Sequence, residues 1–459
     1  MTRLCKYGWA VGLLSALASP SAFPAEATPH STGAKKPNVI FILADDLGYA
    51  DIGTYGCTDI PTPNIDRIAA RGVRFTDAYA NGAVCTPSRA AFMTGRYQHR
   101  YGVEFFVPLP AVARTMPKRL SEAGYATGMV GKWHLGPIMP VDRGFDSYFG
   151  FLAGMHGYLP KPTGNTQLTA PLFRDHEPME ETRYLTDAFG DEATKFIEKQ
   201  RDATRPFFLY LAFNAVHTPD EATEKCLQRF PNLKGQRQKY AAMLSSMDDA
   251  IGQVLAKLEA VGKTNDTLVI FSNDNGAWLM HSGPMRANND PLRGEKGETF
   301  EGGIRVPLMM QWPGVITPGT VYRQPVMGFD VSATILAAGG ADMRELDGVD
   351  LIPFVKGEKQ GLPHEALFWR CRPHYTNYAV RQGDWKLVYC SQQHSPAKDM
   401  LFNLAEDVGE QHDLAMKYPE KLAELKKRYE AWSTEVDADC VKAGLKPMQS
   451  VPGEGSEKN

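Results

Sequence analysis

The chain has 459 residues, of which 43% are hydrophobic and 22% charged, and its formal net charge is −3. These values are ordinary for a soluble globular protein, and the length is enough for more than one domain. The small net charge excludes a general electrostatic affinity for nucleic acid or anionic membranes, so any anion must be bound by a local cluster of cations.

The N-terminus has the pattern of an export signal. Basic residues precede a short apolar stretch from Trp9 to Ala18, and Ala25-Glu26-Ala27 supplies an A-x-A cleavage site, with Ala16-Leu17-Ala18 as the earlier alternative. The stretch is too short for a membrane-spanning helix, and an anchor formed by it is the less favoured alternative. We therefore expect a signal peptide over residues 1–27 and a soluble mature protein that is periplasmic or secreted, with no membrane or nucleic-acid partner.

Cysteine usage agrees with export only in part. Six cysteines follow the predicted signal peptide, an even number that could pair fully in an oxidising compartment. Cys371 and Cys390 flank a predicted hairpin and are the pair expected to form a disulfide, with two reduced thiols as the alternative. Cys85 has another predicted use, described below, which leaves five cysteines and at least one unpaired thiol.

The middle of the chain alternates buried strands with helices. Between Gln236 and Val261 the apolar residues recur at three- and four-residue spacing, which is typical of an amphipathic helix. Thr62 and Pro63 indicate the start of a shorter helix. Alternating strands and helices predict a doubly wound α/β sheet. Continuous apolar runs, typical of strands buried on both faces of a parallel sheet, occur at Asn38–Ala44, Tyr125–Val130, Phe207–Phe213 and Thr267–Ser272.

The pattern changes after about Gly357. Short strand-like runs joined by turns are followed by a helical segment, which together indicate a smaller α+β domain. We expect an α/β domain at 37–357 and the α+β domain at 358–459. The predicted elements of the second domain are Ala366–Arg370, Tyr378–Arg381, Trp385–Tyr389 and the closing helix Tyr418–Glu435.

Polar side chains follow the carboxyl ends of the four predicted strands, where an open α/β sheet binds its ligands. The aspartates and the asparagine among them form an all-oxygen set that suits Ca²⁺ or Mg²⁺ and not zinc. Each alone is more typical of a helix cap or a solvated turn, but their joint placement favours a metal site. These side chains are Asp45, Asp46, Lys132, His134, His217, Asp274 and Asn275.

The most specific segment is CTPSR at residues 85–89, followed by TGR at 94–96. Thr86 is expected to cap a helix whose first residue is the proline, with the glycine at its end. Cys85 then lies at a helix N-terminus, where backbone N–H groups and the helix dipole attract an anion. Arg89 lies one turn along and can grip an oxyanion with two hydrogen bonds. A buried structural thiol is the alternative for a lone cysteine, and the whole string disfavours it.

C-x-P-S-R followed by T-G-R resembles the maturation signature of the type I, formylglycine-dependent sulfatases of the alkaline-phosphatase-like superfamily. Every further block expected of that family occurs in order between about Pro37 and Gly357. The resemblance implies a large, mixed, mostly parallel sheet sandwiched by helices, with an antiparallel sheet in the smaller C-terminal subdomain. The further blocks are Ala44-Asp-Asp-Leu-Gly-Tyr49, Gly131-Lys-Trp-His-Leu-Gly136, Asp274-Asn-Gly276 and Lys296-Gly-Glu-Thr-Phe-Glu-Gly-Gly-Ile-Arg-Val-Pro307.

The resemblance also implies the chemistry of the site. A dedicated maturation enzyme would oxidise Cys85 to formylglycine, whose hydrated gem-diol is the nucleophile. Arg89 and Lys132 would hold and polarise this diol, and Lys296 would bind the sulfate. The two histidines would transfer protons: His217 to the leaving group, and His134 from the second hydroxyl of the diol. The cation, usually Ca²⁺ with Mg²⁺ as the alternative, would be bound by Asp45, Asp46, residue 85, Asp274 and Asn275.

The sequence does not identify the substrate. An exported enzyme of this kind is expected to act on sulfated saccharides from polysaccharide breakdown, with small aryl sulfates as the alternative. The family varies in the loops at 98–110, 154–186 and 277–293. For four polar residues in these loops, a packing or surface role is favoured over substrate contact, and they are His99, His156, His281 and Arg286.

Two other classes of protein remain as alternatives. A phosphate or phosphonate monoester hydrolase of the same superfamily would have a serine or threonine nucleophile and a His-rich second metal site, where this chain has Cys85. A secreted glycan-binding protein with an inactive site would lack at least one of the predicted catalytic residues, and none is missing.

Overall fold

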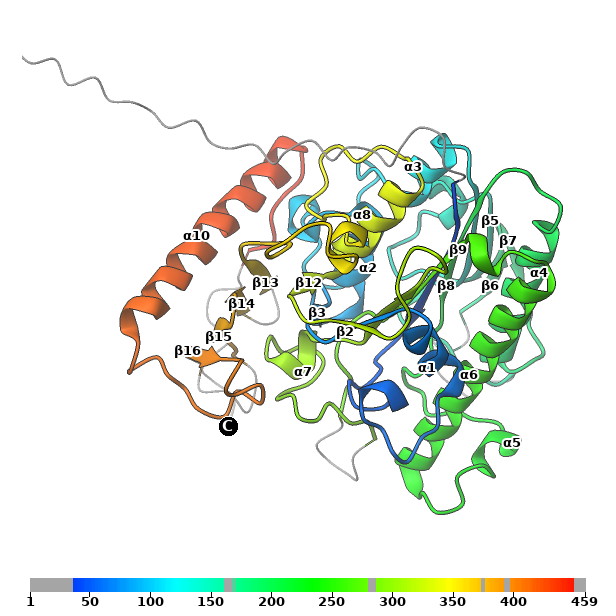
Figure 1. Ribbon diagram of the computed structural model, residues 1–459, viewed down its shortest axis with the longest axis horizontal. Helices are drawn as coiled ribbons and strands as arrows, with labels where there is room; N and C mark the ends of the chain where they lie inside the picture. The colour runs from blue at the N-terminus through cyan, green and yellow to red at the C-terminus, as the bar shows by residue number, and fades with distance from the viewer. Residues whose placement is uncertain are drawn as a thin grey trace, which may run out of the picture.

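The computed structural model describes residues 36–160, 168, 170–279, 286–372, 376–391 and 397–449. The predicted signal peptide and His281 lie outside these residues. A large α/β body contains most of the described chain, and a small C-terminal sheet with one long helix packs beside it (Figure 1). No helix among the described residues combines the length and apolarity needed to cross a membrane.

The body is built on a ten-stranded mixed sheet, which confirms the predicted fold class. Five central strands, from β9 to β5, run parallel, and the pairings toward both edges are antiparallel except that of the outermost strand β11, which is parallel to β2. The four strands predicted from apolar runs form most of this centre, and every residue of them is buried. The strands in spatial order are β11 (Thr320–Tyr322), β2 (Val73–Phe75), β10 (Leu308–Gln311), β9 (Thr267–Asn273), β1 (Asn38–Ala44), β8 (Phe207–Ala212), β4 (Ala126–Lys132), β5 (Ser147–Phe151), β6 (Leu172–Arg174) and β7 (Glu177–Met179).

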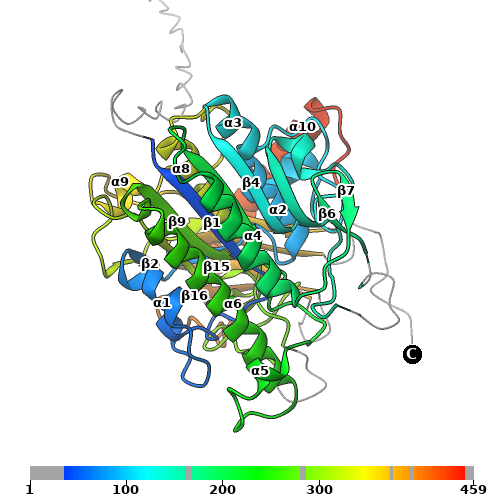
Figure 2. The same cartoon turned by 90° about the vertical axis from the view of Figure 1, so that its right-hand side faces the viewer.

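Helices cover both faces of the sheet. Alternate residues of β1 enter separate hydrophobic cores: Ile40 and Ile42 pack with α1, α4 and α6, whereas Val39 and Phe41 pack with α2, α3 and α8. Figure 2 shows α4 and α6 lying side by side across the first face. The helices are α1 (Pro63–Ala70), α2 (Cys85–Thr94), α3 (Met116–Glu122), α4 (Leu185–Lys199), α6 (Gly235–Ala260) and α8 (Gly328–Ala338).

Short elements connect these layers. The remaining elements of the body are α5 (Glu224–Leu227), α7 (Glu301–Ile304), α9 (Ile352–Val355), the paired strands β3 (Ala78–Tyr79) and β12 (Val326–Met327), and the 3-10 helices Gly53–Tyr55, Gln98–Tyr101, Pro140–Arg143 and Thr264–Asp266.

The C-terminal part is an antiparallel four-stranded sheet covered by α10 (Pro419–Lys442). Three strands match the prediction to within one residue, the closing helix begins as predicted but continues past Glu435 to Lys442, and the fourth strand, β16, was not expected from the sequence. Tyr97 and Phe329 of the α/β body belong to the same hydrophobic core as this sheet and α10. The strands are β13 (Leu367–Cys371), β14 (Asn377–Gln382), β15 (Trp385–Tyr389) and β16 (Asp399–Asn403).

The predicted Cys371–Cys390 disulfide is not formed. Both residues are buried, and all six cysteines in the described part of the chain are thiols. The two residues are therefore reduced thiols, which was the alternative to the disulfide. Burial raises the pKa of Cys371 to about 12, which keeps its thiol protonated.

A buried charge cluster joins the C-terminal sheet to the body. Lys386 Nζ lies 2.7 Å from Glu301 Oε1 and 2.9 Å from Glu410 Oε1, and all three side chains are fully buried. Removing the ammonium group leaves two carboxylates facing each other away from water, which is costly.

Lys386→Met is therefore expected to lower the free energy of unfolding by about 3 kcal/mol. Lys398, whose exposed ammonium group lies 2.8 Å from Asp413 Oδ2, is the matched control, and Lys398→Met should change it by less than about 1 kcal/mol. Urea unfolding followed by circular dichroism checks both values. Equal effects of the two substitutions would show that the buried cluster contributes no more than a surface pair.

Candidate active site

The predicted site residues meet at one edge of the main sheet. Because β9, β1, β8 and β4 are consecutive parallel neighbours, their carboxyl ends lie side by side. Asp45 and Asp46 follow β1, Lys132 ends β4, and Asp274 follows β9 by one residue. All four of these side chains are fully or almost fully buried.

Gly131 brings β4 close to β8 just before Lys132. Its φ is +114°, and a Cβ at this position would collide with the carbonyl oxygen of Ala212. A glycine is therefore required where the strand delivers the lysine side chain to the site.

Cys85 is the first residue of α2, so the helix begins earlier than predicted. Val84 occupies the N-cap position, and Thr86, expected to cap the helix, makes no capping hydrogen bond. Proline is tolerated at any position of the first turn, because an N–H group there would have no partner within the helix. The position of Pro87 therefore does not determine which residue begins the helix. The placement of Cys85 at a helix N-terminus nevertheless stands.

Carboxylate oxygens of Asp45 and Asp274 and the sulfur of Cys85 all lie within 4.8 Å of one another, and Asp45, Asp46 and His217 form an equally compact second set. Three buried oxygens in this cluster have no hydrogen-bond partner among the described residues: Asp45 Oδ1, Asp274 Oδ1 and Asn275 Oδ1. Buried polar atoms are nearly always paired, so three convergent unpaired oxygens indicate room for a ligand. Oxygen donors of this kind suit Ca²⁺ or Mg²⁺.

Hydrogen bonding orients Asn275 for this task. Its amide nitrogen donates to Asp46 Oδ1 at 2.8 Å and to the carbonyl oxygen of Gly276 at 2.9 Å. Both contacts use the Nδ2 group, and the buried side-chain oxygen has no hydrogen-bond partner among the described residues.

Each aspartate is paired with at least one cationic side chain, and Asp45 also has Arg89 Nη2 at 3.6 Å from its Oδ2. Lys132 Nζ lies 2.5 Å from Asp45 Oδ2, and Lys296 Nζ lies 2.8 Å from Asp46 Oδ2. Arg89 donates from Nε at 2.9 Å to Asp274 Oδ2, and its Nη1 donates to the carbonyl oxygen of Lys132 at 3.0 Å. The three cations balance the three aspartates, so a bound divalent cation would leave two positive charges facing an anion.

The carboxyl groups respond differently to this environment. Burial opposes ionisation of Asp46, but Lys296 and His217 outweigh it and hold the pKa of Asp46 well below its usual value. Burial together with the nearby charge of Asp45 raises the pKa of Asp274 above its ordinary value, because Arg89 offsets these effects only in part. Asp274 is thus the carboxylate that most needs further positive charge to ionise.

His217 presents one nitrogen to the cluster. Its Nδ1 lies 2.7 Å from the carbonyl oxygen of Thr218. Because a carbonyl only accepts hydrogen bonds, Nδ1 carries the proton, and Nε2 is the nitrogen that faces Asp46 Oδ2 at 3.5 Å. Burial lowers the pKa of His217 to about 4.

His134 lies on the β4 side of the cluster with a left-handed backbone, φ +56°. Its Nδ1 is buried without a hydrogen-bond partner among the described residues, and its ring stacks on the half-exposed Phe106 at 5.5 Å between centroids. Burial, with further contributions from Lys132 and Arg89, lowers the pKa of His134 well below its ordinary value. The imidazole is therefore neutral and able to accept a proton.

Four other side chains of the α/β body serve packing or structural ion pairs. Trp133 is buried and donates from Nε1 to the carbonyl oxygen of Ile138. His99 is buried against Trp432, with Nε2 facing the carbonyl oxygen of Arg370. Arg293 lies over the ring of Phe300, and Arg305 pairs with Asp77 and Glu301.

Tyr158 was missed by the sequence reasoning. Its buried hydroxyl lies 2.5 Å from the carbonyl oxygen of Asn214 and 2.7 Å from that of His217. Arg286, for which packing was favoured, is fully buried and donates to the carbonyl oxygen of Val216. No local pattern indicates either contact, because each joins loops that are distant in the sequence.

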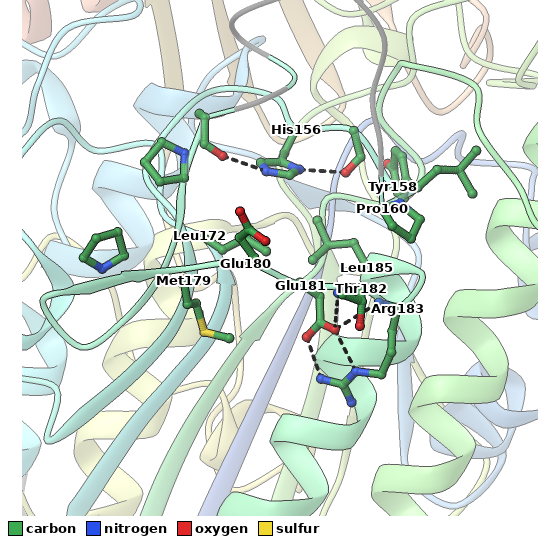
Figure 3. Close-up of a pocket in the computed structure, with 15 residues that line it drawn as sticks. His156, Tyr158, Pro160, Leu172, Met179, Glu180, Glu181, Thr182, Arg183 and Leu185 are labelled. Atoms are coloured by element: carbon green, nitrogen blue, oxygen red, sulfur yellow. Dashed lines mark hydrogen bonds and ion pairs between the residues drawn. The ribbon is translucent and has the colours of Figure 1, made fainter.

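A cavity of about 800 Å³ lies within the predicted variable loop at 154–186 (Figure 3). Tyr158 forms part of its lining, and the hydroxyl of this residue donates a hydrogen bond to the carbonyl oxygen of His217. The other described residues that line it include none of the predicted metal-binding or catalytic side chains. The chemistry therefore resides at the strand ends and not in this cavity.

Known proteins are similar to this chain along most of its length. The model of the Sulfatase family matches residues 37–341, and that of the N-sulphoglucosamine sulphohydrolase C-terminal domain matches residues 295–435. The chain is 31% identical to steryl-sulfatase of Rattus norvegicus, with 92% of this chain and 91% of the relative covered. It is also 31% identical to N-acetylgalactosamine-6-sulfatase of Homo sapiens, over 85% and 84% of the two chains.

Solved structures are similar over almost the whole chain. The crystal structure of Ps i-CgsB in complex with k-i-k-neocarrahexaose has 37% sequence identity and a TM-score of 0.82, covering 90% of this chain and 95% of that one. PsFucS1 sulfatase from Pseudoalteromonas sp. has 26% identity and a TM-score of 0.75, covering 90% and 92%. The chain thus belongs to the sulfatase family, and it is a sulfuric ester hydrolase.

Proposed function

We propose that this sulfatase hydrolyses sulfate esters of saccharides with a formylglycine derived from Cys85 and a divalent cation, Ca²⁺ or alternatively Mg²⁺. The observation that carries the proposal is the convergence of Cys85, at the N-terminus of α2, with three unpaired buried oxygens and three cationic side chains. Formylglycine supplies a hydrated aldehyde that can attack sulfur and later release the sulfate, and the cation supplies positive charge.

The state of Cys85 supports its conversion. Burial raises the pKa of its thiol, and the nearby carboxylates of Asp274 and Asp45 raise it further against the opposing effect of Lys132. The unmodified residue is thus a protonated thiol, which is a poor nucleophile. A maturation enzyme would have to act before this residue is enclosed in the fold, and such an enzyme is the partner that we propose for biogenesis.

The cation would be held by Asp45, Asp46, Asp274, Asn275 and residue 85. The unpaired oxygens of three of these residues fit a hard cation, and neither compact group of possible ligands among the described residues holds more than one sulfur or imidazole, the donors that zinc favours. Two charged oxygens of the cluster are also held by Lys132 and Lys296, so the ligands are fixed before the cation binds.

The surrounding side chains provide the remaining chemistry. Arg89 and Lys132 lie against the carboxylates that face residue 85 and would hold its hydroxyl groups, while Lys296 would neutralise the sulfate oxygens. His217 keeps its Nδ1 proton on the carbonyl oxygen of Thr218, so it would bind a second proton at Nε2, which the anionic substrate favours, and pass that proton to the departing oxygen. His134 would take a proton from the hydroxyl that drives sulfate release.

We propose sulfated saccharides as the substrate class, with small aryl sulfates as the alternative. The structural relative at 37% identity is bound to a hexaose, and its similarity extends over 90% of this chain. A desulfation screen of the mature, modified enzyme over defined sulfated oligosaccharides tests this substrate class. Turnover confined to aryl sulfates would favour the alternative.

We also propose that residues 1–27 direct export to the periplasm or beyond the cell. N-terminal sequencing of the exported protein tests this proposal.

The two histidines are expected to fail differently when they are replaced. His217→Ala should slow hydrolysis of esters with poor leaving groups, such as sugar hydroxyls, by about 10²-fold or more, and that of 4-nitrophenyl sulfate much less, because a nitrophenolate departs without a proton. His134→Ala should release about one equivalent of alcohol per enzyme and then stall, with sulfate retained by the protein. Rapid-quench kinetics with ³⁵S-labelled substrate measures both. Equal losses for both variants on both leaving groups, without retained sulfate, would refute the assignment of roles.

A further inference from the structure

The segment that carries His217 is held from one side by a buried tyrosine. Tyr158 Oη lies within hydrogen-bonding distance of the carbonyl oxygens of both Asn214 and His217, at 2.5 and 2.7 Å. The side chain is almost completely buried, and its ring stacks on that of Tyr184 at 5.8 Å between centroids. A hydroxyl has one proton to donate, so the two carbonyls share it and are kept close together.

Arg286 holds the same segment from another side. Its Nη2 donates to the carbonyl oxygen of Val216, and its Nε donates to Asp220 Oδ1 at 2.7 Å. The guanidinium group is fully buried and lies over the ring of Tyr240 at 4.9 Å. Burying a guanidinium group is costly, and here it is offset by contacts on both sides of His217 in the sequence.

The segment is also fixed to the carboxyl end of β1, where two of the proposed metal ligands lie. The backbone N–H of Val216 donates to the carbonyl oxygen of Asp45 at 2.8 Å, and that of Asp45 donates to the carbonyl oxygen of Ala215 at 3.0 Å. The His217 backbone thus has a defined position relative to the cluster. What remains to be set is the direction of the ring.

Ring direction depends on the next peptide group. His217 Nδ1 donates to the carbonyl oxygen of Thr218, and this contact turns Nε2 toward the cluster. Tyr158 fixes the carbonyl just before Thr218, and Arg286 fixes Asp220 just after it. A shift of about 1 Å at this point would move Nε2 away from a departing oxygen, and misplacement of that size can cost about 10²-fold in rate.

We propose that Tyr158 and Arg286 are positioning residues that aim His217 Nε2 at the leaving oxygen. The inference rests on the acid role proposed for His217 above. The two residues belong to the loops at 154–186 and 277–293, where the family is expected to vary.

The test compares Tyr158→Phe with Tyr184→Phe. Tyr184 is a matched control because its buried hydroxyl also donates to a carbonyl, that of Glu221, at 2.8 Å, four residues beyond His217. Rates are measured on substituted phenyl sulfates, from 4-nitrophenyl to 4-methoxyphenyl. Tyr158→Phe should lower kcat for the poorest leaving group by about tenfold and that for 4-nitrophenyl sulfate by less than about threefold, with little change in KM. Tyr184→Phe should change both ends of the series equally.

Arg286→Lys is the second variant, since it keeps the charge and loses the two-sided contact. Arg286→Lys should also lower kcat more for poor leaving groups than for 4-nitrophenyl sulfate, as expected for Tyr158→Phe. A readout without turnover is the ¹⁵N spectrum of the His217 ring: protonation at Nδ1 should dominate in the unaltered protein and in Tyr184→Phe, and be reduced in Tyr158→Phe.

The outcomes separate this inference from the proposed function. His217→Ala is measured in parallel, and if it leaves the leaving-group dependence unchanged, the acid role itself is wrong. If His217→Ala steepens the dependence while Tyr158→Phe and Arg286→Lys behave like Tyr184→Phe, with the ring tautomer unaltered, the positioning role is overturned and the acid role stands.

Discussion

Cys85→Ala is expected to abolish sulfate ester hydrolysis, with a loss of at least about 10⁴-fold in kcat, while the protein remains folded. The residue supplies the only proposed nucleophile, so no neighbouring group replaces it. Its side chain is small and lies at the first position of α2, where the backbone and not the side chain determines the helix. Steady-state kinetics on the substrate identified by screening measures the loss, and thermal unfolding checks the fold.

Cys226→Ala is the matched control for this substitution. Cys226 is another buried thiol in a first helical turn, that of α5, and it belongs to the hydrophobic core on the α4 and α6 face of the sheet. Its replacement should lower stability slightly and leave kcat unchanged. Residual activity of more than a few per cent in Cys85→Ala would show that residue 85 is not the nucleophile.

Removal of the divalent cation is expected to abolish activity and lower stability together. Free Ca²⁺ at about 100-fold above its Kd should add about 2.7 kcal/mol to the free energy of unfolding, because only the folded chain gathers the ligands. Asp274→Asn removes a charged ligand and also the partner of Arg89, so both the activity and the Ca²⁺-dependent rise in Tm should disappear. Calorimetry in Ca²⁺ and in chelator measures the rise.

Asp248→Asn tests whether replacing any buried aspartate removes the Ca²⁺-dependent rise in Tm. Asp248 is buried in α6 and accepts hydrogen bonds from the backbone of Asn64 and Ile65, away from the cluster. This variant should lower Tm in both solutions and keep the Ca²⁺-dependent rise. An unaltered rate and Tm for the parent protein in chelator would contradict the oxygen-ligand site.

The central sheet was predictable because burial on both faces leaves a continuous apolar signal. Each central strand of six or seven residues carries it. The strands β6 and β7 have three residues each, and only one of their six residues is buried, so no periodicity is long enough to identify them. β16 was missed for a similar reason, since only Met400 to Phe402 within it are buried.

The cluster was predictable because strand ends converge by topology alone. Any chain with four parallel neighbours brings the residues after β1, β4, β8 and β9 to one edge, whatever the loops do. The contacts of Tyr158 and Arg286 depend instead on how separate loops pack, which no spacing in the sequence encodes. The left-handed backbone of His134 is likewise a tertiary effect, since histidine rarely adopts it unaided.

Mass analysis of the peptide that contains residue 85 tests the central claim most directly. The protein would be produced together with a sulfatase-maturing enzyme, purified in active form and digested. We predict an aldehyde or its hydrate in place of the thiol, in a proportion that follows specific activity across preparations of differing maturation. An unmodified thiol at Cys85 in fully active protein would contradict the account.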